Sequence, residues 1–261
     1  MEPDADVIAY YDRDEEHARL LDDPIGRLEL ARTKRLLRRV LPPAPARVLD
    51  IGGGSGVYAS WLVELGYEVE VIDLVPLHVQ RCVAGGIPAE VGDARHLQRH
   101  DGSYDAVLLL GPLYHLPERD DRLLALREAH RVLVPGGVVA AAAISRYAPM
   151  IDGLARQWEA LLARRDVVVV TLGDGRHTNP ERAEGWFTTA YFHLPDELSA
   201  EVADAGFDAV DVRSVESMGW VLPQLADVDL DLLCELLDLL DAAPSLLGAS
   251  SHLLATGRKD D

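Results

Sequence analysis

The chain has 261 residues, of which 48% are hydrophobic, enough for one large domain or one domain with a lid. Its formal net charge of −19 opposes a nucleic-acid partner, because binding to that polyanion depends largely on phosphate neutralisation by Lys and Arg. The sequence has no run of about eighteen apolar residues that could span a membrane, and its acidic start lacks the pattern of a signal peptide. Its two cysteines lie far apart in the sequence. We therefore expect a reducing, cytoplasmic setting.

Helix and strand patterns alternate over the first part of the chain. Apolar residues at helical spacing predict a helix over residues 24–40, which the proline-rich residues 42–45 end. Further strands are predicted at residues 47–51, 68–72, 88–91, 104–110 and 138–144, with helices at residues 57–65, 77–84 and 119–134 between them. This alternation is typical of a doubly wound α/β fold.

The pattern changes after Ser145. Residues 149–164 are predicted to be helical, and residues 165–193 irregular with a high density of aromatic side chains. A helix beginning near residue 194 is followed by strands at residues 207–215 and 250–256, which flank a Leu-rich helix near residues 230–240. No repeat or linker composition divides the chain, so we expect a single domain with insertions.

The most informative run is Val-Leu-Asp-Ile-Gly-Gly-Gly-Ser-Gly at residues 48–56. A strand that enters a glycine-dense turn forms a nucleotide-sized gap at the carboxyl edge of a parallel sheet. Glycine permits a positive φ and a close approach of the backbone to a ligand. Gly54, Gly56 and Ala59 also satisfy the dinucleotide pattern Gly-x-Gly-x-x-Gly/Ala, so this run by itself leaves the ligand open.

Motifs after the glycine run narrow the choice. Asp73 ends the second strand at a distance that suits a ribose diol, and Gly92-Asp93-Ala94 follows the third strand. Gly-Pro-Leu-Tyr-His-Leu closes the fourth strand at residues 111–116, and Arg-Val-Leu-Val-Pro-Gly-Gly precedes the fifth at residues 131–137. With these ordered motifs, residues 46–145 resemble the class I S-adenosylmethionine-dependent methyltransferases, in particular the small-molecule type related to quinone-biosynthesis enzymes.

The resemblance implies a mostly parallel seven-stranded sheet with a Rossmann-like arrangement, an antiparallel last-inserted strand and helical or irregular lid insertions. It divides the single domain of residues 1–261 into an N-terminal helical cover (1–45), a cofactor-binding core (46–145), a substrate cover (146–195) and C-terminal strands and helices (196–261). Residues expected to contact S-adenosylmethionine are Tyr11, Arg32, Asp50, Gly52, Gly54, Gly56, Asp73, Leu74, Asp93, Ala94 and Leu110.

Within this set, Asp73 is expected to hold the ribose hydroxyls, and Asp93 with Ala94 the adenine. Tyr11 would shield the sulfonium, and Arg32 would pair with the methionine carboxylate. The alternative for Arg32 is a solvated face that it shares with the other basic side chains of its helix. The Gly-Pro-Leu-Tyr-His stretch lacks the Asn or Asp that positions an amine in N-methylating relatives.

His115 is the candidate catalytic residue, because it follows the strand expected to face the transferring methyl group. A neutral imidazole takes a proton from a hydroxyl, so the rate would rise with pH through a histidine-like titration. The alternative is a histidine that only packs locally. Side chains expected to contact substrate are Tyr114, His177, Tyr191 and His193. The histidine spacings are too loose to predict a metal site.

The sequence therefore predicts a monomeric or homodimeric methyltransferase that acts on a small molecule, with O-methylation slightly favoured over N- or C-methylation. A nicotinamide-dependent oxidoreductase and a non-catalytic adenosylmethionine-binding module remain alternatives. A nucleic-acid or protein methyltransferase would be expected to show a basic groove or an added recognition domain.

Overall fold

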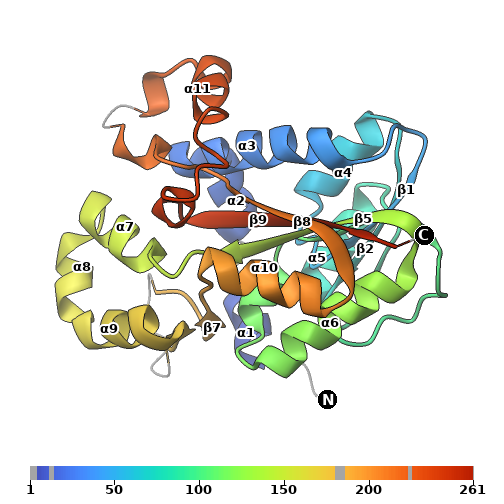
Figure 1. The fold of residues 1–261 in the computed structure, drawn as a ribbon, viewed down its shortest axis with the longest axis horizontal. Helices are drawn as coiled ribbons and strands as arrows, with labels where there is room; N and C mark the ends of the chain where they lie inside the picture. Colours follow the sequence, from blue (N-terminus) through green and yellow to red (C-terminus); the bar gives the residue numbers. More distant parts are fainter. Residues whose placement is uncertain (1–4, 12–14, 180–185, 223–224, 261) are drawn as a thin grey trace.

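A seven-stranded sheet forms the centre of the molecule (Figure 1). The structure is a computed structural model that describes residues 5–11, 15–179, 186–222 and 225–260. The strand order is β3-β2-β1-β4-β5-β9-β8. The strands of this sheet are β1 (Arg47–Ile51), β2 (Glu68–Asp73), β3 (Ala89–Val91), β4 (Tyr104–Leu109), β5 (Leu133–Ile144), β8 (Phe207–Ser214) and β9 (His252–Lys259).

Strand directions confirm the predicted topology. Strands β1 to β5 pair in parallel, whereas β9 lies between β5 and β8 and is antiparallel to both. The order of the parallel strands reverses between β1 and β4, and a doubly wound sheet binds its ligand in the crevice at such a reversal. The carboxyl ends of β1, β2 and β4 therefore bring the motif residues to one edge.

Helices cover both faces of the sheet. One face packs against α3 (Pro24–Val40), α4 (Val57–Glu64) and α5 (Pro76–Ala84), and the other against α6 (Arg119–Val132) and α10 (Pro195–Asp204). The apolar spacing of each helix provides the buried stripe for this packing. The remaining α-helices of the described residues are α1 (Ala5–Tyr11), α2 (Glu15–Asp22), α7 (Ala148–Ala155), α8 (Trp158–Ala163), α9 (Arg165–Asp174) and α11 (Leu230–Leu237).

Helices α7, α8 and α9 form a separate group at one end of the sheet (Figure 1). The predicted helix over residues 149–164 is divided into α7 and α8. The prediction of irregular structure from residue 165 is wrong, because residues 165–174 form α9. Its run of valines disfavours a helix, but Val168 and Thr171 are buried one turn apart and Gly175 ends the helix at a φ of 82°. Beyond it, β6 (Arg176–His177) pairs with β7 (Ala190–Tyr191).

The Pro-Gly-Gly turn before the fifth strand also differs from the prediction. Helix α6 ends at Val132, and β5 begins at Leu133, before the turn. Leu133 pairs with Tyr104 and Val138 with Ala106, so the turn forms an irregularity inside β5. Proline is tolerated at such a position because the ladder is already interrupted there.

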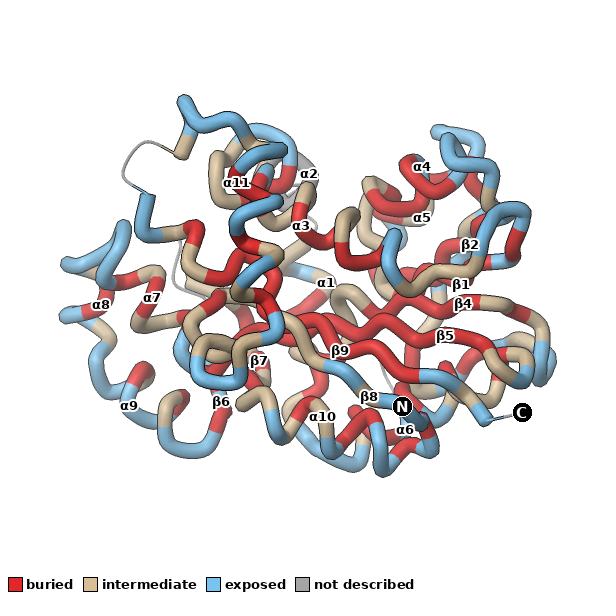
Figure 2. Tube along the Cα trace, turned by 45° about the horizontal axis from the view of Figure 1, so that its top comes forward, coloured by how far each residue is buried: buried red, intermediate tan, exposed pale blue. Residues whose placement is uncertain are grey.

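Burial is greatest along the middle strands, as the red segments of β1, β4 and β5 in Figure 2 show. These strands are covered on both faces, which explains why they read as nearly continuous apolar runs. Both cysteines, Cys82 and Cys234, are free and buried. Among the described residues, no helix combines the length and apolar character needed to cross a bilayer.

Candidate functional site

A cavity of about 260 Å³ opens at the carboxyl ends of the parallel strands. Its floor comes from the ends of β1, β2 and β4, and α1 and α3 contribute to its walls. Most of the predicted cofactor residues line it, namely Tyr11, Asp50, Gly52, Gly54, Asp73, Leu74, Asp93, Ala94 and Leu110, together with His115 and Tyr114. The fold therefore gathers motifs from four separate loops around one space.

The glycine loop after β1 shapes one side of this cavity. Gly52, Gly54 and Gly56 have φ values of 67°, 57° and 82°, a region that side chains rarely adopt. A Cβ added to Gly54 would meet no protein atom within 4 Å, so a side chain there would extend into open space beside the cavity. Gly56 does not line the cavity; a Cβ there would lie 2.9 Å from the Cys82 sulfur, so its role is to let α4 pack on α5.

Asp50 lies beneath the glycine loop with no exposed surface. Neither of its carboxylate oxygens has a hydrogen-bond partner among the described residues. Burial, together with the charge of Asp73, raises the pKa of Asp50 to about 7. A buried carboxylate without a partner is costly unless a cation or a donor compensates it. The cavity is therefore suited to a ligand that carries positive charge.

We expect Asp50→Asn to stabilise the ligand-free protein at pH 8 while it weakens binding of a cationic ligand. The folded-state pKa of Asp50, about 7, lies above the ordinary value of 3.8. The stability that the wild-type protein has with a neutral Asp50 below pH 4 is therefore lost as the pH rises through 7 and the buried carboxylate becomes charged. That difference corresponds to at most about 4 kcal/mol of unfolding free energy. Urea titrations should show a gain that shrinks toward pH 4; equal stability at pH 8 would contradict the unpaired charge.

Asp73 ends β2 and faces the glycine loop. Its Oδ2 accepts the backbone N–H of Gly54 at 2.8 Å, and its Oδ1 accepts that of Val75 at 2.8 Å. The ring of His78 lies 3.1 Å from the same Oδ1. These contacts fix the orientation of the carboxylate, whose remaining lone-pair positions can accept ligand hydroxyls. The predicted ribose acceptor is thus held ready at the cavity wall.

Asp93 uses its carboxylate mainly to hold Arg95. Both of its oxygens accept from the guanidinium, at 3.0 and 2.7 Å, and Arg95 also pairs with Asp121 at 2.9 Å. Leu74, Ala94 and Leu110 give the cavity apolar wall surface between the polar groups. An adenine at this end could therefore pack on Leu74 and Ala94.

Aromatic side chains close the cavity on the side of α1. The Tyr11 hydroxyl and the Nε2 of His115 lie 2.8 Å apart, and their rings meet edge to face. The ring of Phe187 stacks on His115 at 5.4 Å and also meets Tyr10 edge to face. The N-terminal helix and the predicted substrate cover therefore meet over the cavity.

The structure corrects the expected pH behaviour of His115. Burial lowers the pKa of His115 to about 3, only partly opposed by the charge of Asp73. The imidazole is then neutral throughout the physiological range and is a weak base. A rate that rises with pH through a histidine-like titration does not follow from His115, which instead contacts Tyr11 and the wall of the cavity.

Helix α1 is expected to gain protection from hydrogen exchange when ligand binds. Val7 and Tyr11 of this seven-residue helix line the cavity, so a bound ligand would add contacts to those that the helix already makes. Exchange measured with and without S-adenosylhomocysteine should slow at Tyr10 and Tyr11. Equal rates in both states would contradict a cover. Residues 1–4 and 12–14 of the predicted cover lie outside the described residues.

The structure places Arg32 away from the cavity. Its side chain has no exposed surface, and its donors bind the carbonyl of Val215 at 2.9 Å and the carboxylate of Asp241 at 2.9 Å. A further ion pair joins it to Asp238. Arg32 thus connects α3 to the segment after α11. Neither a methionine carboxylate contact nor a fully solvated basic face is consistent with this geometry.

Two of the predicted substrate residues, Tyr191 and His193, belong to ion-pair networks, and that of His193 is buried. The Tyr191 hydroxyl donates to Glu197 at 3.1 Å, and Nε2 of His193 lies 3.2 Å from Glu201. Glu201 is also paired with the buried Arg122 at 2.7 Å, which compensates its charge. Neither residue lines a cavity described here. They connect residues 190–193 to α6 and α10.

His177 lines a second cavity of about 200 Å³ between the α7–α8 pair and residues 186–192. Its ring stacks between Trp186 and Phe192, at 5.9 and 5.0 Å. Ile144, Ala148 and Leu161 add further apolar wall. Of the four predicted substrate residues, Tyr114 therefore lies at the first cavity and His177 at the second.

Sequence reasoning missed several polar residues that line the first cavity, among them Glu29, Thr33 and His252. Glu29 and Thr33 are one turn apart on α3, beside its apolar stripe, which is a weak signal of a cavity-facing pair. His252 begins β9, and no local pattern distinguishes it. Their side chains reach the same space only because α3 and β9 pack together in the fold.

The residues present fit S-adenosylmethionine. The unpartnered Asp50 carboxylate suits the positive charge of its methionine end, and the oriented Asp73 carboxylate suits its ribose hydroxyls. The open space beside Gly54 lets the ligand come close to the backbone of the glycine loop. The first cavity therefore provides the polar groups that this cofactor requires.

Comparisons with known proteins agree with this geometry. Residues 49–141 match the methyltransferase domain family. The chain is 38% identical over 100 residues to a methyltransferase of Mycobacterium tuberculosis, a match that spans 38% of this chain and 40% of that protein. It is 29% identical over 185 residues to the ubiquinone biosynthesis O-methyltransferase of Xanthomonas campestris, covering 66% of this chain and 73% of that protein.

A solved structure supports the same fold over nearly the whole chain. The crystal structure of an S-adenosylmethionine-dependent methyltransferase from Thermotoga maritima superposes with a TM-score of 0.64 at 18% identity. The superposition covers 97% of this chain and 99% of that one.

Proposed function

We propose that the chain is a class I S-adenosylmethionine-dependent methyltransferase that transfers the methyl group of this cofactor to a hydroxyl of a small organic molecule, as its methyltransferase domain match and its likeness to a ubiquinone biosynthesis O-methyltransferase favour. The observation that carries the proposal is the buried, unpartnered carboxylate of Asp50 beneath an open glycine loop. A cationic ligand compensates that charge, and a nicotinamide dinucleotide with its anionic pyrophosphate would oppose it.

The cofactor, when bound, supplies an electrophilic methyl group on a sulfonium. The chain's own residues would hold it in place: Asp50 and the glycine loop at its methionine end, Asp73 at the ribose, and Leu74 with Ala94 at the adenine. Holding the two reactants next to each other removes much of the entropic cost of the reaction. Tyr11, Tyr114 and His115 would close the cavity over the reacting groups.

A small acceptor is favoured by the size and lining of the site. The two cavities are lined largely by apolar and aromatic side chains, with a few polar groups at defined positions, as is usual for small-molecule sites. The formal charge of −19 opposes a nucleic-acid acceptor. The likeness to a ubiquinone biosynthesis O-methyltransferase favours oxygen as the acceptor atom.

A panel of phenols, carboxylic acids, alcohols and amines, incubated with methyl-labelled S-adenosylmethionine, tests this proposal. Mass spectrometry should detect a labelled methyl group on one class of hydroxyl compound, with S-adenosylhomocysteine formed in equal amount. Methylation of amines alone would contradict the hydroxyl assignment. Binding of the cofactor without transfer to any member of the panel would favour the non-catalytic binding module.

A further inference from the structure

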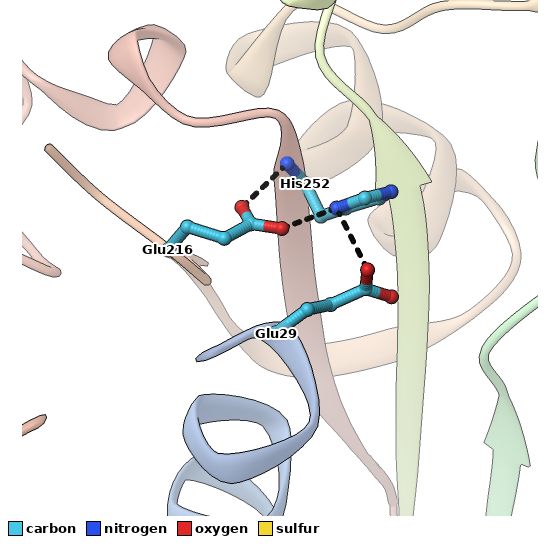
Figure 3. Close-up of side chains that lie close together, drawn as sticks. All are labelled: Glu29, Glu216 and His252. Atoms are coloured by element: carbon cyan, nitrogen blue, oxygen red, sulfur yellow. Dashed lines mark hydrogen bonds and ion pairs between the residues drawn. The ribbon is translucent and has the colours of Figure 1, made fainter. Parts of the chain in front are cut away.

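A histidine–glutamate pair lies beside the first cavity, which His252 lines (Figure 3). His252 begins β9, and Glu216 follows β8, its neighbour in the sheet. The Nδ1 of His252 is hydrogen-bonded to Oε1 of Glu216. Glu216 has no exposed surface, whereas 21% of the His252 side chain is exposed. The histidine therefore presents part of its ring to the cavity, with the glutamate behind it.

Both carboxylate oxygens of Glu216 take part in hydrogen bonds in this arrangement. Its Oε2 accepts the Ser250 hydroxyl at 2.7 Å and the backbone N–H of His252 at 2.9 Å, while its Oε1 binds the ring. Glu216 thereby holds a proton on Nδ1, so a ring that also carries a proton on Nε2 is the cationic imidazolium. Figure 3 shows the second ring nitrogen on the side away from both carboxylates. Within the described part of the chain, Nε2 has no hydrogen-bond partner, so it is the atom left for a ligand.

The other charges around His252 are also balanced. Glu29 of α3 lies 3.7 Å from Nδ1, and its own carboxylate is bound by Arg19 of α2 at 2.7 Å. The carboxylates of Glu29 and Glu216 thus face two cations, Arg19 and the protonated ring of His252. Although Glu29, Glu216 and His252 are close enough to share a cation, their oxygens already accept hydrogen bonds, so a proton on the imidazole satisfies the group. Burial and Arg19 act to lower the pKa of His252, but Glu29 and Glu216 outweigh them and raise it to about 9.

His252 also stands between the two cavities. It lines both the first cavity, which holds the cofactor motifs, and the second, aromatic one. A ligand atom at Nε2 would thus have the methyl donor on one side and the apolar walls formed by Trp186, Phe187 and Phe192 on the other. The junction is where the reacting group of an acceptor with an apolar body would lie.

We propose that His252, held by Glu216, is an oxyanion-binding residue that donates a hydrogen bond from Nε2 to the ionised hydroxyl of a phenol-like acceptor whose apolar body occupies the second cavity. This inference rests on the proposed function and names its substrate class. The hydroxyl proton leaves to water, the oxygen forms its bond to the methyl carbon, and the carbon–sulfur bond breaks with its electron pair staying on sulfur. His252 keeps its proton throughout.

Ionisation of bound 4-nitrophenol tests the proposal without turnover. The protein is saturated with S-adenosylhomocysteine, which has no methyl group to transfer, and phenolate absorbance is followed against pH. In the wild-type complex the bound probe should ionise about one to two pH units below the free probe, the scale of one charge-assisted hydrogen bond. His252→Gln should lose that shift and Glu216→Gln should reduce it. His100→Gln, which changes an exposed histidine remote from both cavities, should keep it.

The proposal would be overturned if bound 4-nitrophenol had the same pKa in the wild-type and His252→Gln complexes, or if the probe did not bind. A wild-type NMR titration gives a second check that needs no variant: His252 should titrate near pH 9, and an imidazole that is neutral at pH 7 would contradict it. Calorimetry with S-adenosylhomocysteine separates the two hypotheses. If it does not bind, the proposed function itself fails; if it binds and the probe shows no shift, only the role of His252 fails.

Discussion

Gly54→Val is expected to abolish binding of S-adenosylmethionine and to leave the fold in place. The added side chain meets no protein atom near its Cβ, so its atoms would occupy the space that the ligand needs. Valine at a φ of 57° also strains the backbone by about 1–3 kcal/mol, which the fold should tolerate. Isothermal titration should detect no heat of binding, and the circular dichroism spectrum should match that of the wild type.

Gly102→Val is the matched control for this variant. Gly102 has a φ of 60°, and a Cβ there would also meet no atom within 4 Å, but the residue lines neither cavity. It should therefore show the same backbone strain with unchanged affinity. Normal binding by Gly54→Val would mean that the glycine loop does not contact the cofactor.

Asp73→Ala is expected to weaken cofactor binding by about 30-fold or more, equivalent to about 2 kcal/mol. The substitution removes the predicted acceptor of the ribose hydroxyls and also frees the backbone N–H groups of Gly54 and Val75 that the carboxylate now binds. Both losses act on affinity in the same direction. Isothermal titration measures the change, and thermal unfolding shows whether the variant is folded.

Asp105→Ala provides a comparison for the loss of a carboxylate. Asp105 accepts the backbone N–H of Arg47 at 2.8 Å, but it lies at the start of β4, at the opposite edge of the sheet from the cavity. Its removal should leave affinity unchanged. Similar affinities for the Asp73 and Asp105 variants would remove the ribose assignment.

Local patterns predicted the fold well where neighbouring residues decide the structure. The helix over residues 24–40 and the strand over residues 47–51 have the predicted bounds, because apolar spacing and proline positions mark their ends. The irregular structure predicted for residues 165–174 is wrong, because this segment forms α9 with Val168 and Thr171 buried, although valine is a poor helix former. Propensity is a weak guide when tertiary packing decides.

The site was predictable only as far as it depends on motifs. The glycine loop and Asp73 lie at the ends of strands, so their sequence positions fix their place in the sheet. Arg32 was misassigned because its partner Asp241 is 209 residues away in the sequence. His252 was missed for the same reason, since Glu29 and Glu216 reach it from distant segments. Contacts of this range follow from the packed fold and leave no local pattern.

The most direct test of the account is a calorimetric titration of the wild-type protein with S-adenosylmethionine and, in parallel, with NAD⁺. The unpartnered Asp50 carboxylate and the oriented Asp73 carboxylate predict binding of S-adenosylmethionine at one site and no detectable binding of NAD⁺. Binding of NAD⁺ without binding of S-adenosylmethionine would contradict the assignment of the cavity and of the proposed reaction.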